Sequence, residues 1–548
     1  MATGGDDEVG AGIQRKDTSM PSRATRRAMA ATTAVTLAAS GLAVTAAEAA
    51  PPGYGSRNEV NRLVRAVTLD GTLRHLRAMQ KIADVNDDTR VSGTGGYDAS
   101  AGYVAGQLVA AGYDVTFDQF TFPFFAETGP TVVQRVEPTA EDYAEGTDYA
   151  IMSFSGSGDV TAPVEAVDVV LPPGEANSST SGCEAEDFAG FTPGNVALIQ
   201  RGTCAFGDKA ANAEAAGASA VLIFNEGQEG RTEPVAGTLG GVVAEDLPVV
   251  GLSFAAGQEL AQTEGAVVRV ATETLNEERS TYNVIAETRG GRTDNVVMAG
   301  AHLDSVEEGP GINDNASGAG ALLEVAIQLA GTVEEPRNKV RFAWWAAEEA
   351  GLLGSEHYVT SLSTSEIGDI AAYLNFDMVG SPNYVRFVYD GDDSDAEGAG
   401  PGPEGSAAIE RVFERYYESK GLAYEGTDFT GRSDYGPFIA VGIPAGGLFT
   451  GAEGIKTEEQ EEVYGGEAGV AYDPCYHEAC DTILNVDNTV LRQNADAIAY
   501  AVGTLARSTK AVNDRTRAAA AAGAAVAGSA RVPEAQIRRY DAKGHASS

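Results

Sequence analysis

Residues 296–349 constrain the fold of this chain more than any other stretch, because short apolar runs alternate there with loops that contain acidic residues and a histidine. Residues 296–301 form an apolar run with β-branched residues at its start, which predicts a buried strand. Residues 317–330 have helical spacing, and residues 340–346 are a second buried run. This alternation of strand, turn, helix and strand predicts a parallel α/β sheet.

Side chains that can perform chemistry fall where these apolar runs end, and a third run at residues 371–376 is followed in the same way. In open α/β sheets, sites form outside the carboxyl ends of strands, so we expect these side chains to gather at one sheet edge. A single carboxylate at a strand end is usually a solvated loop residue, but the clustering favours a site. The residues are His302, Asp304, Asp314, Glu348, Glu349, Asp377 and, much later in the chain, His477.

These residue types fit a hydrolase with two metal ions. Zinc binds imidazole nitrogen and carboxylate oxygen, and a bridging carboxylate can hold two ions around one water molecule. The adjacent Glu348 and Glu349 allow a division of labour. One glutamate can bind metal while the other takes the proton from the attacking water.

Seven motifs follow one another in the order AHLDSV, PGINDNASG, FAWWAAEEAGLLGS, NFDMVGSP, GRSDYGPF, GGLFTGA and CYHEACD. In this order they resemble the M28 family of di-zinc aminopeptidases, particularly the secreted actinobacterial and fungal type. The resemblance covers residues 58–128 and 275–508, with the motifs in the second segment. It implies a zinc-exopeptidase-like α/β fold, in which a mixed, mostly parallel sheet is flanked by helices, and two Zn²⁺ ions per chain.

The resemblance also implies a role for individual residues. Glu348 matches the general base, and Asp304 matches the partner that orients the ring of His302. Tyr476 and Arg432 match positions that stabilise the oxyanion and hold the substrate backbone. The implied zinc ligands are His302 and Asp377 for one ion, Glu349 and His477 for the other, and Asp314 as the bridge between them.

The chain divides into five expected segments. Residues 1–50 have basic residues, an Ala-rich apolar run and an A-x-A site, which predict a secretory signal and export, by either the general or the twin-arginine route. Residues 51–130 and 275–508 are expected to form the peptidase domain. Residues 131–274 include GNVALIQRGTCAFGDKAANAEAAGASAVLIFNEG and resemble a small β-rich protease-associated (PA) domain, with a gating, orienting, binding or purely structural role. Residues 509–548 are expected to be a flexible Ala- and Arg-rich tail.

The four cysteines are expected to form disulfides, because an even count in an exported chain favours bridges. Cys183 and Cys204 lie in the PA region, whereas Cys475 and Cys480 bracket His477. A zinc site made by cysteines is the weaker alternative, because no C-x₂-C pair is present.

Charge limits the partners. The formal net charge of −41 argues against nucleic acid, whose phosphates attract the opposite sign. The acidic residues 389–405 lack the spacing of a calcium-binding loop. Arg492 lies near Asp496, where a second carboxylate would help a calcium site, so calcium is possible but unsupported.

We therefore expect a secreted zinc aminopeptidase that acts on peptide or protein N-termini, with no membrane attachment once the signal is removed. The resemblance suggests large apolar N-terminal residues, and the oligomeric state is left open. Two alternatives remain. A carboxypeptidase or dipeptidase of the same architecture would need a basic pocket, for which Arg432 is the candidate. A receptor-like binding protein built on an inactivated peptidase fold would be expected to lack some of the metal ligands.

Overall fold

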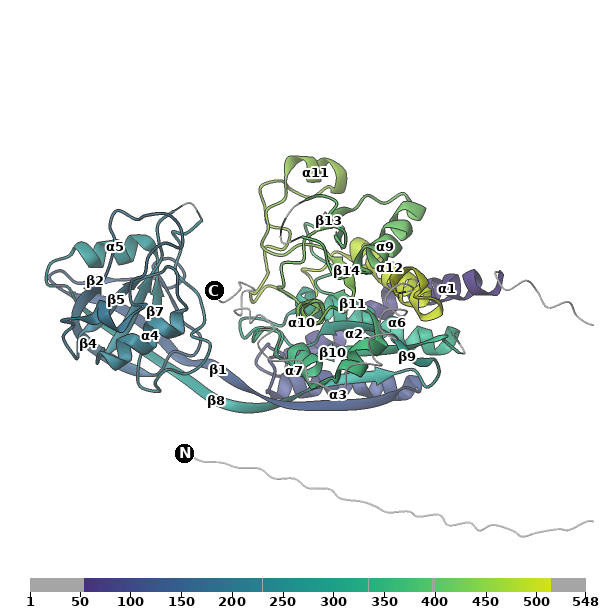
Figure 1. Cartoon of the computed structure of the whole chain (residues 1–548), viewed down its shortest axis with the longest axis horizontal. Helices are drawn as coiled ribbons and strands as arrows, with labels where there is room; N and C mark the ends of the chain where they lie inside the picture. The colour runs from purple at the N-terminus through teal and green to yellow at the C-terminus, as the bar shows by residue number, and fades with distance from the viewer. Residues whose placement is uncertain (1–53, 229, 334, 397, 399, 514–548) are drawn as a thin grey trace, which may run out of the picture. The chain divides into compact units, whose positions relative to one another are not determined.

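The structure is a computed structural model that describes residues 54–228, 230–333, 335–396, 398 and 400–513 (Figure 1). The expected secretory signal lies outside the described residues. Among the residues that are described, no helix is long and apolar enough to cross a membrane. The helices outside the PA region are α1 (Tyr54–Ala66), α2 (Leu69–Ala83), α3 (Gly95–Ala111), α6 (Gly318–Thr332), α7 (Leu353–Ser361), α8 (Thr364–Asp369), α9 (Ser406–Lys420), α10 (Tyr435–Ala440), α11 (Glu458–Tyr464), α12 (Asn488–Arg507) and α13 (Lys510–Asn513).

A mixed, mostly parallel sheet forms the centre of the peptidase region. Its strand order is β13-β12-β14-β11-β9-β10-β8, and the neighbours β11, β9 and β10 all run parallel. Each of these three strands is buried along most of its length because helices cover both faces of the sheet. The strands are β9 (Arg292–His302), β10 (Asn338–Trp345), β11 (Ile370–Phe376), β12 (Phe387–Tyr389), β13 (Glu425–Thr427) and β14 (Ala445–Phe449).

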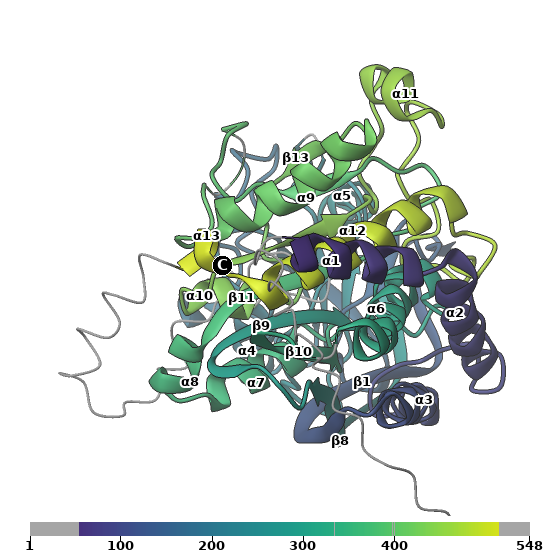
Figure 2. The ribbon, with the colours of Figure 1, turned by 90° about the vertical axis from the view of Figure 1, so that its right-hand side faces the viewer.

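Two helical layers enclose this sheet. On one face, α6 packs against α2, α3 and α12, and α1 packs against α12 (Figure 2). That face contains the larger apolar core, in which Trp344 and Phe376 are fully buried. On the other face, Trp345, Tyr373 and Phe438 form a second core with residues of α7 and α10. The fold class expected from the sequence is therefore confirmed.

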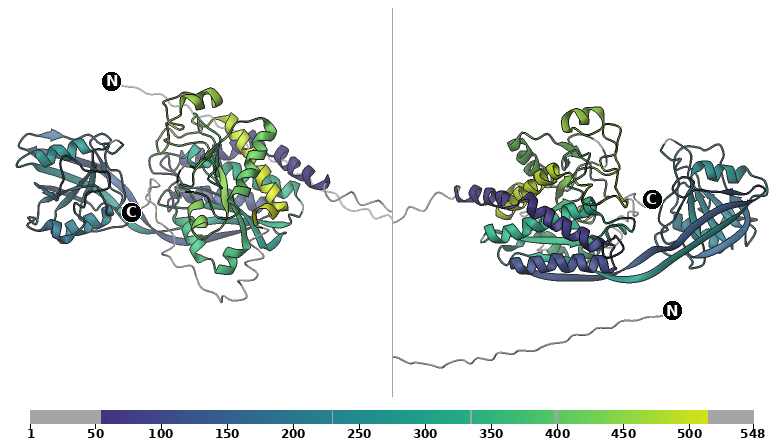
Figure 3. Two further views of the ribbon diagram at one scale, coloured as in Figure 1. Left: turned by 45° about the horizontal axis from the view of Figure 1, so that its top comes forward. Right: turned by 180° about the vertical axis from the view of Figure 1, so that it is seen from behind.

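Two long antiparallel strands join the peptidase region to the PA region. Strands β1 (Asp114–Glu137) and β8 (Val267–Glu287) pair from Asp114 opposite Glu287 to Glu137 opposite Val267, and Figure 3 shows both as continuous ribbons. One end of β8 pairs with β10 and the other with β4. The expected domain boundary at residues 130/131 falls within β1, where the register shifts between Gly129 and Val132, and the boundary at residues 274/275 falls within β8, where Thr274 lies opposite Glu127.

The PA region is a small mixed sheet with short helices. Strands β4, β5, β6 and β7 are parallel to one another, and β3 pairs with β7 in the antiparallel direction. The elements are β2 (Glu141–Asp142), β3 (Tyr149–Ile151), β4 (Gly158–Val167), η1 (Ala185–Phe188), β5 (Val196–Gln200), α4 (Phe206–Ala215), β6 (Ala220–Phe224), β7 (Val249–Leu252) and α5 (Phe254–Gln262).

The expected tail begins later than the sequence suggested. Residues 509–513 are ordered, with Val512 buried in the larger core and the Thr509 hydroxyl accepting a hydrogen bond from Asn295 at 2.8 Å. Residues 509–513 therefore pack against the peptidase region. Residues 514–548 of the expected tail lie outside the described residues.

Candidate metal centre and active site

Parallel strands deliver most of the candidate residues to one edge. His302 is the last residue of β9, Glu348 and Glu349 follow β10, and Asp377 follows β11 directly. Because these strands are parallel neighbours, their carboxyl ends meet at the same side of the sheet. Asp314 belongs to the turn η2 (Ile312–Ser317), which leads from β9 into α6.

The side chains form two groups that share Asp314. In the first, the Nε2 atom of His302 lies 3.1 Å from Oδ1 of Asp314 and 3.3 Å from Oδ1 of Asp377. In the second, the Nε2 atom of His477 lies 3.4 Å from Oδ2 of Asp314 and 3.1 Å from Oε2 of Glu349. Asp314 thus turns one carboxylate oxygen toward each group, as a bridging ligand would.

These residues fit a pair of zinc ions. Donor atoms about 2.0–2.1 Å from a tetrahedral zinc are separated from one another by roughly 3.3 Å, which agrees with the separations around both imidazoles. Oδ1 of Asp377 and Oε1 of Glu349 are buried and have no hydrogen-bond partner among the described residues. Buried polar atoms normally have a partner, so these carboxylate oxygens are well suited to a cation.

The electrostatics of the pocket also favour a cation. Burial, together with the charges of Asp377 and Asp434, raises the pKa of Glu348 well above its usual range. Burial likewise raises the pKa of Glu349 to about 7. Burial alone would lower the pKa of His477, but the charges of Glu349 and Asp314 outweigh it and raise the pKa to about 10. The pKa values of the two glutamates are raised chiefly because their carboxyl groups are buried, and the pKa of His477 is raised because carboxylates surround it.

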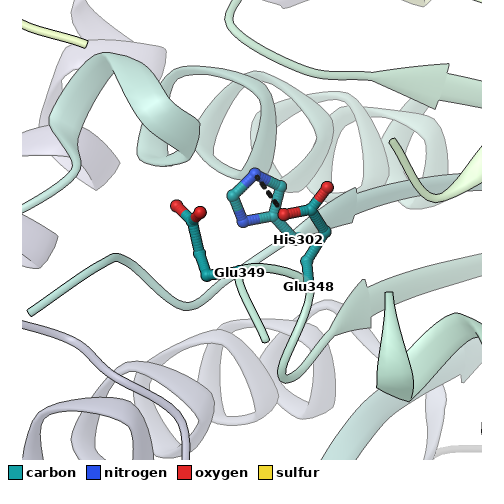
Figure 4. Close-up of side chains that lie close together, drawn as sticks. All are labelled: His302, Glu348 and Glu349. Carbon is teal, nitrogen blue, oxygen red and sulfur yellow. Dashed lines mark ion pairs between the residues drawn. The ribbon is translucent and has the colours of Figure 1, made fainter. Parts of the chain in front are cut away.

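Glu348 and Glu349 point to different places although they are adjacent. Figure 4 shows them on opposite sides of His302, with an ion pair of 3.9 Å between Oε2 of Glu348 and Nε2 of His302. Glu349 instead lies against His477. On the Nδ1 side of the His302 ring, Oδ1 of Asp304 is 3.5 Å away, which places Asp304 where an orienting partner is expected.

The backbone beside the site is unusual. Ala347, Met378 and His477 have positive φ angles of 51°, 47° and 56°, although none is glycine. Ala347 immediately precedes the two glutamates, and Met378 immediately follows Asp377. Such conformations persist only when the surroundings enforce them, and they cluster at functional sites. Sequence reasoning could not detect them because these positions carry no glycine.

Tyr476 and Arg432 also line the pocket. Nη2 of Arg432 donates a hydrogen bond to the Tyr476 hydroxyl at 3.3 Å, and the Tyr476 ring stacks on His477 with centroids 3.9 Å apart. Sequence reasoning missed Glu453, which forms an ion pair with Arg432. It also missed Ser433, whose hydroxyl donates to Oδ2 of Asp377 at 2.5 Å and whose only signal was its place beside Arg432 in GRSDYGPF.

Apolar and aromatic residues supply another wall of the same pocket. Sequence reasoning did not identify this wall, because its members come from separate loops and strands that only the fold brings together. Five residues of this wall are Leu352, Met378, Tyr389, Tyr435 and Phe449.

Both expected disulfides are present. Cys183 pairs with Cys204, and Cys475 pairs with Cys480. The second bridge closes the short loop that contains Tyr476 and His477, which limits the freedom of both residues.

The acidic stretch near Tyr389 forms a separate cluster. Asp390, Asp392 and Glu410 each place an oxygen within 4.8 Å of the others. Asp390 and Glu410 are buried and Asp392 is exposed, and such a group of carboxylates by itself assigns no calcium. Arg492 pairs with Asp496 at 3.0 Å, so that carboxylate already has a cationic partner.

A mostly parallel sheet with imidazole and carboxylate groups gathered at its carboxyl edge defines an α/β protein with a candidate two-metal centre. Comparison with known proteins agrees with that class. The sequence model of Peptidase family M28 matches residues 283–502, and that of the PA domain matches residues 160–260. An aminopeptidase of Pseudomonas aeruginosa is 48% identical over 458 residues, covering 83% of this chain and 84% of the relative.

Two further proteins extend the comparison. Leucine aminopeptidase 2 of Trichophyton rubrum is 47% identical over 343 residues, which are 62% of this chain and 68% of the relative. The structure of BSAP, a zinc aminopeptidase from Bacillus subtilis, matches with a TM-score of 0.59 at 25% identity, covering 81% of this chain and 97% of that protein. The chain belongs to peptidase family M28.

Proposed function

We propose that this chain is a secreted aminopeptidase that uses two zinc ions to hydrolyse the N-terminal peptide bond of peptides and proteins. The observation that carries the proposal is the pair of histidine and carboxylate groups that share Asp314. Family membership supports the peptidase activity. A structural relative, BSAP, is a zinc aminopeptidase, which supports the choice of metal.

The proposed ligands follow from the two groups of donor atoms. His302 and Asp377 hold one ion, and Glu349 and His477 hold the other. Asp314, which turns one oxygen toward each histidine, would contribute to holding both ions, and Asp304 would orient His302 from the far side of its ring.

The chain's own groups then move the protons. Two bound zinc ions would lower the pKa of a shared water and so supply a nucleophile near neutral pH. Glu348 accepts the proton of this water and returns it to the leaving amine, because its carboxylate lines the pocket without being required as a ligand. Burial raises the pKa of Tyr476 well above its usual range, so its hydroxyl stays protonated and donates to the developing oxyanion.

Selectivity for chain ends follows from the charge of the pocket. A free α-amine is cationic, and it would enter a site lined by five carboxylates, two of which, Glu348 and Asp428, are not proposed zinc ligands. The apolar wall that includes Leu352, Met378 and Phe449 would accept a large apolar side chain. The relative named leucine aminopeptidase 2 supports the same preference.

The alternatives have less support. A carboxypeptidase or dipeptidase needs a cation for the substrate carboxylate, and Arg432 is the one arginine or lysine among the described residues that line the pocket. This arginine is already paired with Glu453. A non-catalytic binding protein would be expected to lack ligands, whereas every residue of the proposed set is present and gathered.

Secretion and the domain arrangement are part of the same proposal. The expected signal at residues 1–50 and the two disulfides support an exported protein. Residues 131–274 are proposed to form the PA domain within the peptidase domain of residues 51–130 and 275–508, which is consistent with the match to residues 160–260.

A paired assay on the purified secreted protein tests the proposal. Zinc per chain is measured by elemental analysis, beside cleavage of leucyl peptides whose amine is free or acetylated. We expect about two zinc ions and cleavage of the free-amine peptide alone. Cleavage of the acetylated peptide, or of neither peptide by zinc-loaded protein, contradicts an aminopeptidase, and the absence of zinc contradicts the metal assignment.

A further inference from the structure

Asp481 holds the backbone of the segment that carries the proposed bridging ligand. Its main-chain oxygen accepts a hydrogen bond from the amide of Ile312 at 3.0 Å. Its Oδ1 accepts from the amide of Asn313 at 2.8 Å, and its Oδ2 accepts from the amide of Asp314 at 2.9 Å. One residue thus binds three consecutive amides, the last of which belongs to Asp314, and it is only 2% exposed.

The same residue is tied to the loop that carries His477. Asp481 immediately follows Cys480, one end of the disulfide that closes this loop. The side-chain amide of Asn485 donates to Oδ1 of Asp481 at 3.2 Å and to Oδ1 of Asp473 at 2.9 Å. Asp473 in turn accepts from the amide of Cys475 at 2.9 Å. The network therefore reaches both ends of the disulfide loop.

A second path joins the two segments directly. The side-chain amide of Asn313 donates to Oδ2 of Asp473 at 2.6 Å. As a result, Asn313 contacts Asp481 through its backbone and Asp473 through its side chain. The segment with Asp314 and the loop with His477 are held together by buried, charge-assisted hydrogen bonds, which are stronger than those between neutral groups.

Arg90 holds the opposite side of the same turn. It is fully buried, and its guanidinium donates to the carbonyl oxygens of Pro310 at 2.9 Å and Gly311 at 2.6 Å. Gly311 has φ of 58°, and a Cβ there would lie 2.2 Å from the main-chain oxygen of Asp314, so the turn requires glycine. The guanidinium of Arg90 thus binds the carbonyl oxygens that precede the turn, while Asp481 binds the amides of the turn itself.

We propose that Asp481 is a positioning residue for the metal pair, and this inference depends on the proposed two-zinc function. By holding Asp314 and the His477 loop in one arrangement, Asp481 fixes the separation between two ligands that come from distant parts of the chain. His302 and Asp377 are supplied by strand ends and depend less on it. The ion held by Glu349 and His477 is therefore the one whose affinity depends most on Asp481.

An asparagine at this position provides the test. Asp481→Asn keeps the size of the side chain but removes its charge. In the wild type both carboxylate oxygens accept from backbone amides, whereas in the variant the NH₂ group would replace one of these acceptors and face a backbone N–H. Zinc affinity of the full secreted chain is measured by competition with a chromophoric chelator. We expect one of the two zinc ions to bind about 10- to 100-fold more weakly, the range for partners that orient metal ligands.

Asp487→Asn is the matched control. The carboxylate of Asp487 also accepts from two backbone amides, those of Thr489 and Val490, both at 2.8 Å, but it does so at the start of α12. This variant should keep both zinc affinities. Equal affinities in wild type and Asp481→Asn, or equal losses in both variants, overturn the proposal, because the effect would then be absent or general.

Asn485→Ala keeps the proposal testable if Asp481→Asn does not fold. This variant removes only the link between Asp481 and Asp473, so we expect a smaller, few-fold loss at the same ion, and unchanged affinity overturns the proposal. Asp481→Glu, which retains the carboxylate, should bind zinc more tightly than Asp481→Asn. Wild-type protein that binds no zinc would contradict the proposed function itself, whereas normal wild type with unaffected variants contradicts only the role of Asp481.

Discussion

Replacing Glu348 with glutamine should separate catalysis from metal binding. The side chain is largely buried, with 8% of the residue exposed, and its Oε2 lies 3.9 Å from Nε2 of His302. That separation is beyond hydrogen-bonding distance, so the imidazole does not require the carboxylate for its position. Glutamine has nearly the same size, and we expect the pocket of Glu348→Gln to keep its shape and its zinc.

The expected loss of rate follows from the proposed role. Glutamine cannot accept the proton of the attacking water, and a positioned general base contributes about 100- to 10,000-fold to a rate. This range corresponds to about 3–5 kcal/mol of activation free energy. Because the amine and side chain of the substrate still bind, the loss is expected in kcat, with KM nearly unchanged.

The neighbouring Glu349 supplies a matched control of the same residue type. Its Oε2 lies 3.1 Å from Nε2 of His477, within the second group of donor atoms. Glu349→Gln removes the charge from a proposed ligand, so it should release zinc. Adding excess zinc should restore part of the activity of Glu349→Gln but none of that of Glu348→Gln.

Elemental analysis and steady-state kinetics on a leucyl peptide with a free amine measure both effects. Two variants with the same phenotype would refute the division of labour between the adjacent glutamates. If Glu348→Gln retained more than about a tenth of the wild-type kcat, Glu348 would not be the general base.

Two other predictions follow from the same pocket. The metal-free protein should become less stable as the pH rises, because burial raises the pKa of Glu349 from 4.5 to about 7 and that of Asp434 from 3.8 to about 8. Between pH 4.5 and about 7 for Glu349, and between pH 3.8 and about 8 for Asp434, the folded state binds more protons than the unfolded state. The free energy of unfolding therefore falls as the pH rises. Thermal unfolding in the presence of a chelator, at about pH 5 and about pH 8, measures this change in stability. Added zinc should reverse the pH dependence, because the ion displaces protons from the carboxyl groups. A Tm of the metal-free protein that rises with pH contradicts the prediction. Tyr476→Phe should lower kcat by about 100-fold at unchanged zinc content, since one oxyanion donor is lost; a change confined to KM would instead assign Tyr476 to substrate binding.

The sequence predicted the central strands well because each is buried on both faces. The expected runs at residues 296–301, 340–346 and 371–376 correspond to β9, β10 and β11, and the expected helix at 317–330 corresponds to α6. A parallel strand under two helical layers has to be apolar along its length, which makes it recognisable without an alignment. The ends of such strands are equally recognisable, and this is why the candidate ligands could be named.

Long-range polar contacts could not be predicted in the same way. Arg90 precedes the Gly-rich residues 93–96, yet it is fully buried and binds main-chain carbonyls more than two hundred residues away. Any carbonyl can accept such a bond, so its partners leave no pattern in the sequence. The contacts of Asp481 are similar, because its partners are backbone amides.

Strand β8, which leads back from the PA region, contacts the loop of the paired glutamates through the side chain of Asn283. Asn283, near the end of β8, accepts a hydrogen bond from the amide of Ala346 at 3.1 Å and donates to the carbonyl of Gly354 at 2.9 Å. These two residues flank the loop that carries the paired glutamates. Strand β8 is antiparallel to β10, so its residues before Val284 continue past the carboxyl end of β10, where that loop begins. Asn283 therefore links strand β8 to both ends of the loop that carries the paired glutamates.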